Sequence, residues 1–167
     1  MISFRRVRSM KQVMTVVRLA REIWMEHYVP IVGQEQVEYM LKNFQSEHAL
    51  KEQLSEGYEY YIVMREGVTA GYCAVVADER DTTVMLSKIY VRRSQRGHGV
   101  GKAIAKFVER LCFKRGITKI WLVVNRKNVD SIAWYLRAGF QNVGSTVRDI
   151  GGGFVMDDFR MEKTVLP

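Results

Sequence analysis

Apolar residues recur at helical spacing through the first third of the chain. The first such stretch, which predicts an amphipathic helix, is Val13, Val16, Val17, Ala20 and Trp24. We expect Pro30 and Gly33 to break this helix, because proline removes a backbone donor and glycine favours other backbone conformations. Helical spacing resumes over residues 34–44. Ser46 is expected to begin a third helix, because serine is a common N-cap.

Runs rich in β-branched and aromatic residues occupy the middle of the chain. Residues 58–64 and 70–77 are two such runs, and Glu66-Gly67 between them indicates a turn. A third long run covers residues 83–91. These segments predict an antiparallel meander, and residues 2–7 predict a further strand near the N-terminus.

The second half of the chain alternates between the two patterns. Residues 100–115 carry one apolar stripe and predict a helix that packs on a sheet. A β-branched run over 117–124 predicts a strand, and a further helix is expected to end at Gly139. Two strands, over 139–147 and 154–163, complete the predicted elements.

The chain has the composition of one continuous domain. It has 167 residues and only two prolines, with no internal repeat or low-complexity segment. We therefore predict a single domain over residues 1–167, of the α/β (α+β) class, with a hydrophobic core of its own. No apolar run reaches about eighteen residues, so neither a membrane span nor a membrane partner is expected.

The formal net charge of +8 raises the question of an anionic partner. Lysine and arginine are spread along the chain, without a long basic tract or tail. The sequence also carries no recognisable nucleic-acid-binding motif. We therefore expect no nucleic-acid partner, and a polyanionic small molecule would use part of the charge.

Cysteine and histidine give no sign of a metal site. Cys73 and Cys112 lack metal-binding or redox spacing, and His27, His48 and His98 show no ligand spacing with them. We predict no metal cofactor. Two reduced, packed thiols are expected, which is typical of a cytoplasmic protein.

The most informative segment joins the predicted strand 83–91 to the predicted helix 100–115. It reads Arg96, Gly97, His98, Gly99, Val100, Gly101 and Lys102. Glycines at alternate positions leave the backbone amides open, and the following helix start favours a bound phosphate. A dinucleotide fingerprint would need glycine in place of Lys102, and a Walker loop would need serine or threonine in place of Ala103.

The pattern that remains is R-x-x-G-x-G, formed by Arg96, Gly99 and Gly101. It resembles the pyrophosphate-binding signature of the GCN5-related N-acetyltransferase (GNAT) family. A second motif fits the same family. Members of the family carry the pattern N-x-x-A/S-x-x-x-Y-x-x-x-G-F after their fifth strand, and here N-x-x-S-x-x-x-Y-x-x-x-G-F follows the predicted strand 117–124. The residues that form it are Asn128, Ser131, Tyr135, Gly139 and Phe140. The resemblance covers roughly residues 58–163.

The resemblance implies the GNAT fold, a mixed, mostly antiparallel central sheet flanked by helices in the order β-αα-βββ-α-β-α-ββ. It implies acetyl-CoA as cosubstrate, with the pyrophosphate on residues 96–102 and the pantetheine arm along the backbone of Ile89 and Val91. Asn128 and Ser131 are implied contacts of the cosubstrate. Tyr135 matches the family tyrosine whose hydroxyl could protonate the leaving thiolate, so it is our expected catalytic residue.

The general base is not evident from the sequence. Family members often place a carboxylate on the fourth strand, but residues 85–90 contain none. The other candidates are Glu26, His27, Asp157 and Asp158, while His98 is expected to face the cosubstrate.

The expected activity is transfer of an acetyl group from acetyl-CoA to a primary amine, such as a polyamine or another small amine. Alternatives are acetylation of protein N-termini or lysines, and a non-catalytic acyl-CoA-binding module. The expected partners are a small-molecule amine and a second copy of the chain in a homodimer. Aromatic and acidic residues that could hold the acceptor are Trp24, Tyr28, Tyr39, Met40, Phe44 and the segment 149–158. Strand alternation predicts that one carboxylate of Asp157 and Asp158 points toward the acceptor and the other away.

Overall fold

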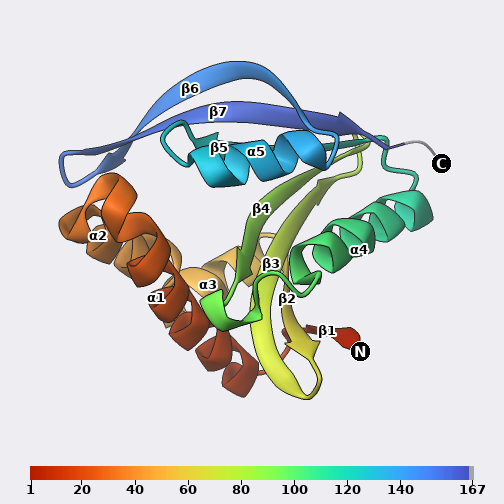
Figure 1. Ribbon diagram of the computed structural model, residues 1–167, viewed down its shortest axis with the longest axis horizontal. Helices are drawn as coiled ribbons and strands as arrows, with labels where there is room; N and C mark the ends of the chain where they lie inside the picture. Colours follow the sequence, from red (N-terminus) through yellow and green to blue (C-terminus); the bar gives the residue numbers. More distant parts are fainter. Residues whose placement is uncertain (166–167) are drawn as a thin grey trace. The chain divides into compact units, whose positions relative to one another are not determined.

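The computed structural model describes residues 1–165, which form two compact units (Figure 1). Unit 1 comprises Met1–Val76 and Lys88–Ile104, and unit 2 comprises Ala77–Ser87 and the chain from Ala105 onward. The chain crosses between the units within β3, β4 and α4. A single domain over residues 1–167 stays a prediction.

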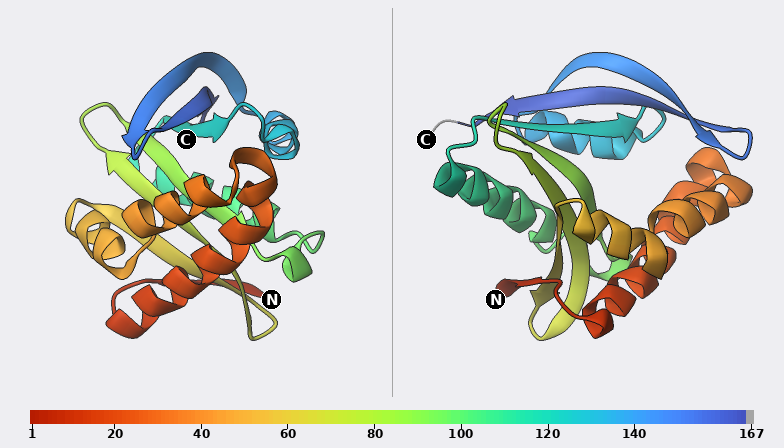
Figure 2. Two further views of the ribbon diagram at one scale, coloured as in Figure 1. Left: turned by 90° about the vertical axis from the view of Figure 1, so that its left-hand side faces the viewer. Right: turned by 180° about the vertical axis from the view of Figure 1, so that it is seen from behind.

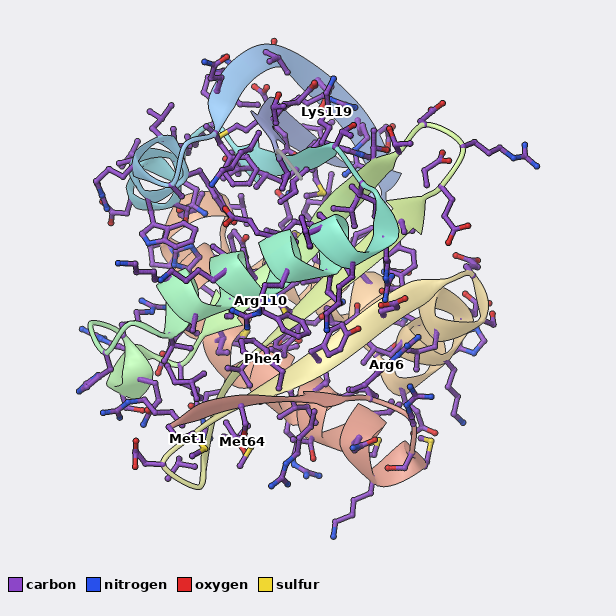
Figure 3. The ribbon with its side chains drawn as sticks, turned by 90° about the vertical axis from the view of Figure 1, so that its right-hand side faces the viewer. Met1, Phe4, Arg6, Met64, Arg110 and Lys119 are labelled. Carbon is purple, nitrogen blue, oxygen red and sulfur yellow. The ribbon has the colours of Figure 1, made fainter. Side chains whose placement is uncertain are left out.

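Unit 1 contains the N-terminal helices and most of the first strands. In chain order its elements are β1 (Ile2–Arg6), α1 (Met10–Val32), α2 (Gln34–Phe44), α3 (Glu47–Ser55), β2 (Tyr58–Arg65), β3 (Val68–Asp78), the end of β4 (Thr83–Val91), the short 3-10 helix η1 (Arg93–Gln95) and the start of α4 (Val100–Arg115). α1 contacts α2 and α3, and α3 contacts β2. Figure 3 shows β1, with Met1, Phe4 and Arg6 labelled, beside β2 and its Met64.

Unit 2 contains the last four elements of the chain. They are β5 (Lys119–Asn125), α5 (Val129–Arg137), β6 (Gln141–Gly151) and β7 (Phe154–Thr164). β6 and β7 form a long, curved hairpin (Figure 2). Lys163 on β7 holds this hairpin to its helices, because its ammonium group donates to Glu109 on α4 and to the Ala138 carbonyl after α5.

The strands pair in the order β1-β2-β3-β4-β5-β7-β6, giving a seven-stranded sheet. β4 and β5 run parallel, whereas β1–β2, β2–β3, β5–β7 and β6–β7 are antiparallel. This mixed, mostly antiparallel sheet and the order of its helices confirm the predicted fold.

The predicted break at Pro30 is wrong, because α1 continues through it to Val32. Pro30 lies in the last turn, so it removes only one intrahelical hydrogen bond. Gly33 ends the helix as predicted: it has φ +88°, and its N–H donates to the Val29 carbonyl at 3.0 Å. At the other end Ser9 and Gln12 form a capping box.

Gly71 marks a close approach of two backbones in unit 1. A Cβ added to it would lie 2.1 Å from the Tyr90 carbonyl oxygen and 3.0 Å from the Val91 Cα. The Arg92 N–H donates to the Ala70 carbonyl at 2.8 Å beside this contact. Only glycine therefore allows β3 and the end of β4 to approach this closely.

We expect Gly71→Ala to destabilise the protein by about 3 kcal/mol, at the upper end of ordinary overpacking costs, because the clash is with backbone. Gly67→Ala is the control, since it adds a Cβ into open space at φ +77°. It should cost only about 1 kcal/mol of backbone strain. Denaturant unfolding measures both values, and equal losses would contradict the close approach.

Candidate active site

The glycine-rich loop of unit 1 runs into the first turn of α4. Gly97 and Gly99 have φ +77° and +78°, conformations that side-chain-bearing residues rarely adopt. The Ala103 N–H donates to the Gly99 carbonyl at 3.0 Å, so Gly99 stands at the N-cap. The helix geometry leaves the N–H groups of residues 100–102 without intrahelical acceptors. A Cβ built on Gly97 or Gly99 meets nothing within 4 Å, so open space lies beside these two glycines.

Positively charged residues lie in and next to this loop in the sequence. Arg93, Arg96 and Lys102 are exposed, whereas Val100 is buried and fixes the start of α4. The Arg96 Nε donates to the Val91 carbonyl at 3.2 Å, which ties the loop to the end of β4. The exposed His98 lies in the same loop, with its Nδ1 2.9 Å from the Arg96 carbonyl oxygen. The loop thus combines open amides, a helix N-terminus and positive charge, as an anion site requires.

The end of β4 lies in the same unit as the loop and is held firmly. Ile89 and Val91 are half-buried there. Between them the Tyr90 hydroxyl lies 2.9 Å from the Tyr28 hydroxyl of α1. The Arg92 guanidinium pairs with Glu22 of α1 at 2.8 Å. Unit 1 therefore brings together Ile89, Val91 and the loop, with α1 as their support.

α5 of unit 2 carries the remaining predicted site residues. Asn128 is the N-cap residue, although its side chain makes no capping hydrogen bond, and it is 4% exposed. Ser131 is half-buried, and Tyr135 is four residues further along the helix, which places both on one face. The Tyr135 ring packs edge-to-face on Trp134 and Phe140, and its carbonyl accepts from the Phe140 N–H at 3.0 Å. Gly139, at φ +97°, follows the helix as predicted.

The base candidates of unit 1 have ordinary surroundings. Glu26 is exposed on α1, and the half-buried His27 packs edge-to-face on Tyr28 at 4.9 Å between ring centroids. Neither feature singles out one of these residues as a base.

Asp157 and Asp158 on β7 have opposite environments. The Asp157 carboxylate pairs with the Arg126 Nε at 2.8 Å. Asp158 is 0% exposed, and neither of its carboxylate oxygens has a hydrogen-bond partner among residues 1–165. Burial raises the pKa of Asp158, the Arg148 charge opposes that rise, and Asp157 adds to it. The two adjacent carboxylates thus differ in burial and pairing, and that one of them points toward the acceptor stays a prediction.

Part of the predicted acceptor-binding set belongs to the core of unit 1. Trp24 is 2% and Met40 is 4% exposed, and the Trp24 ring packs against Tyr28 and Tyr90. Their apolar surface is already used in packing. Tyr28, Tyr39 and Phe44 are half-buried and remain candidates.

The two cysteines are free thiols inside the protein. Burial raises the pKa of Cys73 to about 12 and that of Cys112 to about 11, which keeps both protonated and unreactive. Within residues 1–165, no three His, Cys, Asp or Glu side chains gather into a group that could hold a metal ion. None of the helices in this range has the length and apolarity needed to cross a membrane.

Comparison with known proteins identifies relatives across the whole chain. A spermidine N(1)-acetyltransferase of Thermoplasma acidophilum is 24% identical over 162 residues, covering 93% of this chain and 92% of the relative. The crystal structure of the PaiA N-acetyltransferase from Thermoplasma acidophilum in complex with coenzyme A has a TM-score of 0.78 at 23% identity, over 98% of this chain and 99% of that one. The crystal structure of the ribosomal-protein-S18-alanine N-acetyltransferase from Escherichia coli has a TM-score of 0.71 at 18% identity, over 100% of this chain and 96% of that one. The structural likenesses show a shared fold.

A sequence profile shows to which protein family the chain belongs. The profile of the acetyltransferase (GNAT) family matches residues 17–140, most of the chain. This match confirms the resemblance that the glycine-loop and α5 motifs indicated. The chain therefore belongs to the acetyltransferase (GNAT) family and is an N-acetyltransferase with acetyl-CoA as its cosubstrate.

Proposed function

We propose that this enzyme acetylates the primary amine of a polyamine or another small amine, and that residues 96–102 bind the pyrophosphate of acetyl-CoA. The observation that carries the binding site is the open backbone at Gly97 and Gly99, beside the N-terminus of α4. A pyrophosphate carries two negative charges at neutral pH. It would receive amide N–H groups from the helix start and charge from Arg93, Arg96 and Lys102.

The backbone of Ile89 and Val91 is proposed to bind the pantetheine arm. Their strand end is fixed by the Arg92–Glu22 ion pair and by the Arg96 contact to the Val91 carbonyl. A rigid binding strand favours transfer, because it limits the thioester to few orientations. Asn128 and Ser131 are proposed as further contacts of the arm, from the start of α5.

Tyr135 is proposed to give a proton to the coenzyme A sulfur as the thioester breaks. Its ring is 8% exposed and is held between Trp134 and Phe140, which limits the positions of its hydroxyl group. A phenol O–H at this position can donate a proton as charge develops on sulfur.

The similarity to a spermidine N(1)-acetyltransferase over 93% of the chain supports a polyamine as acceptor. The net charge of +8 acts against this assignment, because it repels a polycation at long range. Binding of a polycation would therefore need a local negative group close to the amine. We also propose that the enzyme works as a homodimer.

Mass spectrometry of the reaction products tests the acceptor. The purified enzyme and acetyl-CoA are incubated separately with spermidine, spermine, butane-1,4-diamine and a peptide that begins with alanine. We expect a mono-acetylated polyamine. Acetylation of the peptide alone would contradict the polyamine assignment and leave the transferase activity in place.

A further inference from the structure

Asp158 is a buried carboxylate for which the protein supplies no partner. It is 0% exposed, and neither oxygen accepts a hydrogen bond from any residue in the range 1–165. A charge in this position loses its hydration and gains no hydrogen bond from the described residues, which is a large cost in a folded protein. A group kept at such a cost is a candidate for function.

The register of the sheet shows which residues share its face. Asp158 lies opposite Asn125 of β5 and Thr146 of β6. Positions two residues away along β7 lie on the same face, so Arg160 and Met156 are its neighbours there. Arg148, opposite Met156, is also on this face.

Each nearby arginine is engaged elsewhere. The Arg148 Nη2 lies 3.8 Å from the Met156 sulfur, and the Arg160 guanidinium lies 4.1 Å from the centre of the Trp121 ring. Arg160 also pairs with Glu162 at 3.7 Å. Arg126 pairs with Asp157 and stacks on Phe159. Three cations therefore surround this part of β7, yet none forms an ion pair with Asp158 within the described chain.

We infer that Asp158 binds the ammonium group of the acceptor and takes its first proton. This inference rests on the proposed amine acetyltransferase function and adds the residue that receives the amine. An ammonium ion supplies what the carboxylate lacks, a positive charge with N–H donors. Enclosure away from water strengthens their attraction. The raised pKa of Asp158 suits it to accept a proton, because the protonated carboxyl is the better tolerated form at this site.

The reaction then balances as follows. One ammonium proton passes to an Asp158 oxygen, and the freed nitrogen lone pair attacks the thioester carbonyl carbon. The C–N bond forms and the C–S bond breaks. The coenzyme A sulfur gains one proton from Tyr135, and the second nitrogen proton, released as the amide forms, restores the Tyr135 hydroxyl. Asp158 releases its proton to solvent, so the sum is one amide, one free thiol and one proton.

Asp158→Asn tests the inference, because it keeps the shape and removes the charge and the basicity. We expect kcat/KM for spermidine at pH 8 to fall by about a hundredfold or more, the range for loss of a proton acceptor. Coenzyme A affinity, measured by calorimetry, should stay unchanged. Asp81→Asn is the control, because Asp81 is exposed in the turn between β3 and β4, and it should change kcat/KM less than about threefold, the scale of an ordinary surface substitution.

A melting experiment on the same proteins needs no turnover. Folding raises the pKa of Asp158, so the folded state holds this proton more tightly than the unfolded state. The free energy of unfolding of the wild type therefore falls as pH rises from the ordinary aspartate pKa to the pKa of Asp158 in the folded protein. Asp158→Asn lacks this loss and should melt at a higher temperature at pH 8. Spermidine should raise the melting temperature of the wild type at pH 8 and leave that of Asp158→Asn unchanged.

The outcomes separate the two proposals. Normal spermidine turnover and an unchanged spermidine shift in Asp158→Asn would overturn the role of Asp158 while the transferase stands. Turnover of the alanine peptide but not of spermidine would overturn the polyamine assignment. The role of Asp158 would then stand if Asp158→Asn lowered peptide turnover about a hundredfold, and would fall if peptide turnover were unchanged. A wild type that acetylates neither amine, with no spermidine shift, would reject both proposals.

Discussion

Replacing Gly99 with leucine is expected to weaken coenzyme A binding at least about a hundredfold. The variant places a side chain in the open space beside the amides of α4, where the pyrophosphate is proposed to bind. The loss of two hydrogen bonds to a charged group, each about 1.5 kcal/mol or more, corresponds to this factor. Isothermal titration calorimetry with coenzyme A measures the dissociation constant.

Gly67→Leu provides a matched control for backbone strain. Gly67 has φ +77°, Gly99 has φ +78°, and a Cβ on either meets nothing within 4 Å. Gly67 lies in the turn between β2 and β3, whereas Gly99 lies in the proposed anion site. The control should therefore lose similar stability and bind coenzyme A normally. Equal affinity in both variants would show that residues 96–102 do not hold the pyrophosphate.

Tyr135→Phe is expected to lower kcat by roughly ten- to a thousandfold, near or below the usual range for an acid–base group. The change keeps the ring packing on Trp134 and Phe140 and removes only the hydroxyl. Because the hydroxyl is proposed to act only as sulfur gains charge, affinity for the cosubstrate should stay nearly unchanged. Steady-state kinetics at saturating amine measures the effect.

Tyr61→Phe in unit 1 is the matched control for this change. Its hydroxyl donates to Glu59 at 2.8 Å, so this variant loses a phenolic hydroxyl outside the proposed site. The control should retain full turnover. Full turnover in Tyr135→Phe, with chemistry limiting the rate, would leave Tyr135 as a packing residue.

Local patterns in the sequence were enough to predict most elements. The boundaries of β4 and α4 agree with the predicted residues 83–91 and 100–115, because turn and helix-start residues flank strong apolar patterns. The sequence does not show that the helix continues through Pro30. The destabilisation of a helix by proline depends on how far the proline lies from the helix end, and apolar spacing does not give that distance.

Features that depend on tertiary contacts could not be predicted. Glycine is required at position 71 because the backbone of Tyr90, 19 residues further along the chain, leaves no room for a Cβ there. Asp157 and Asp158 are adjacent and chemically identical, so alternation alone indicates that they differ but not which one lacks a partner. Their difference arises because Arg126 reaches Asp157, whereas the arginines on the face of Asp158 contact Met156 and Trp121.

The most direct test of the account is the release of free coenzyme A thiol from acetyl-CoA. The wild-type enzyme is assayed with each amine of the panel and without amine, and the thiol is quantified by a chromogenic disulfide. We expect thiol release that depends on a primary amine, with spermidine or a related small amine as the best acceptor, and that falls in Gly99→Leu and Tyr135→Phe. Coenzyme A binding without amine-dependent thiol release from any member of the panel would contradict it.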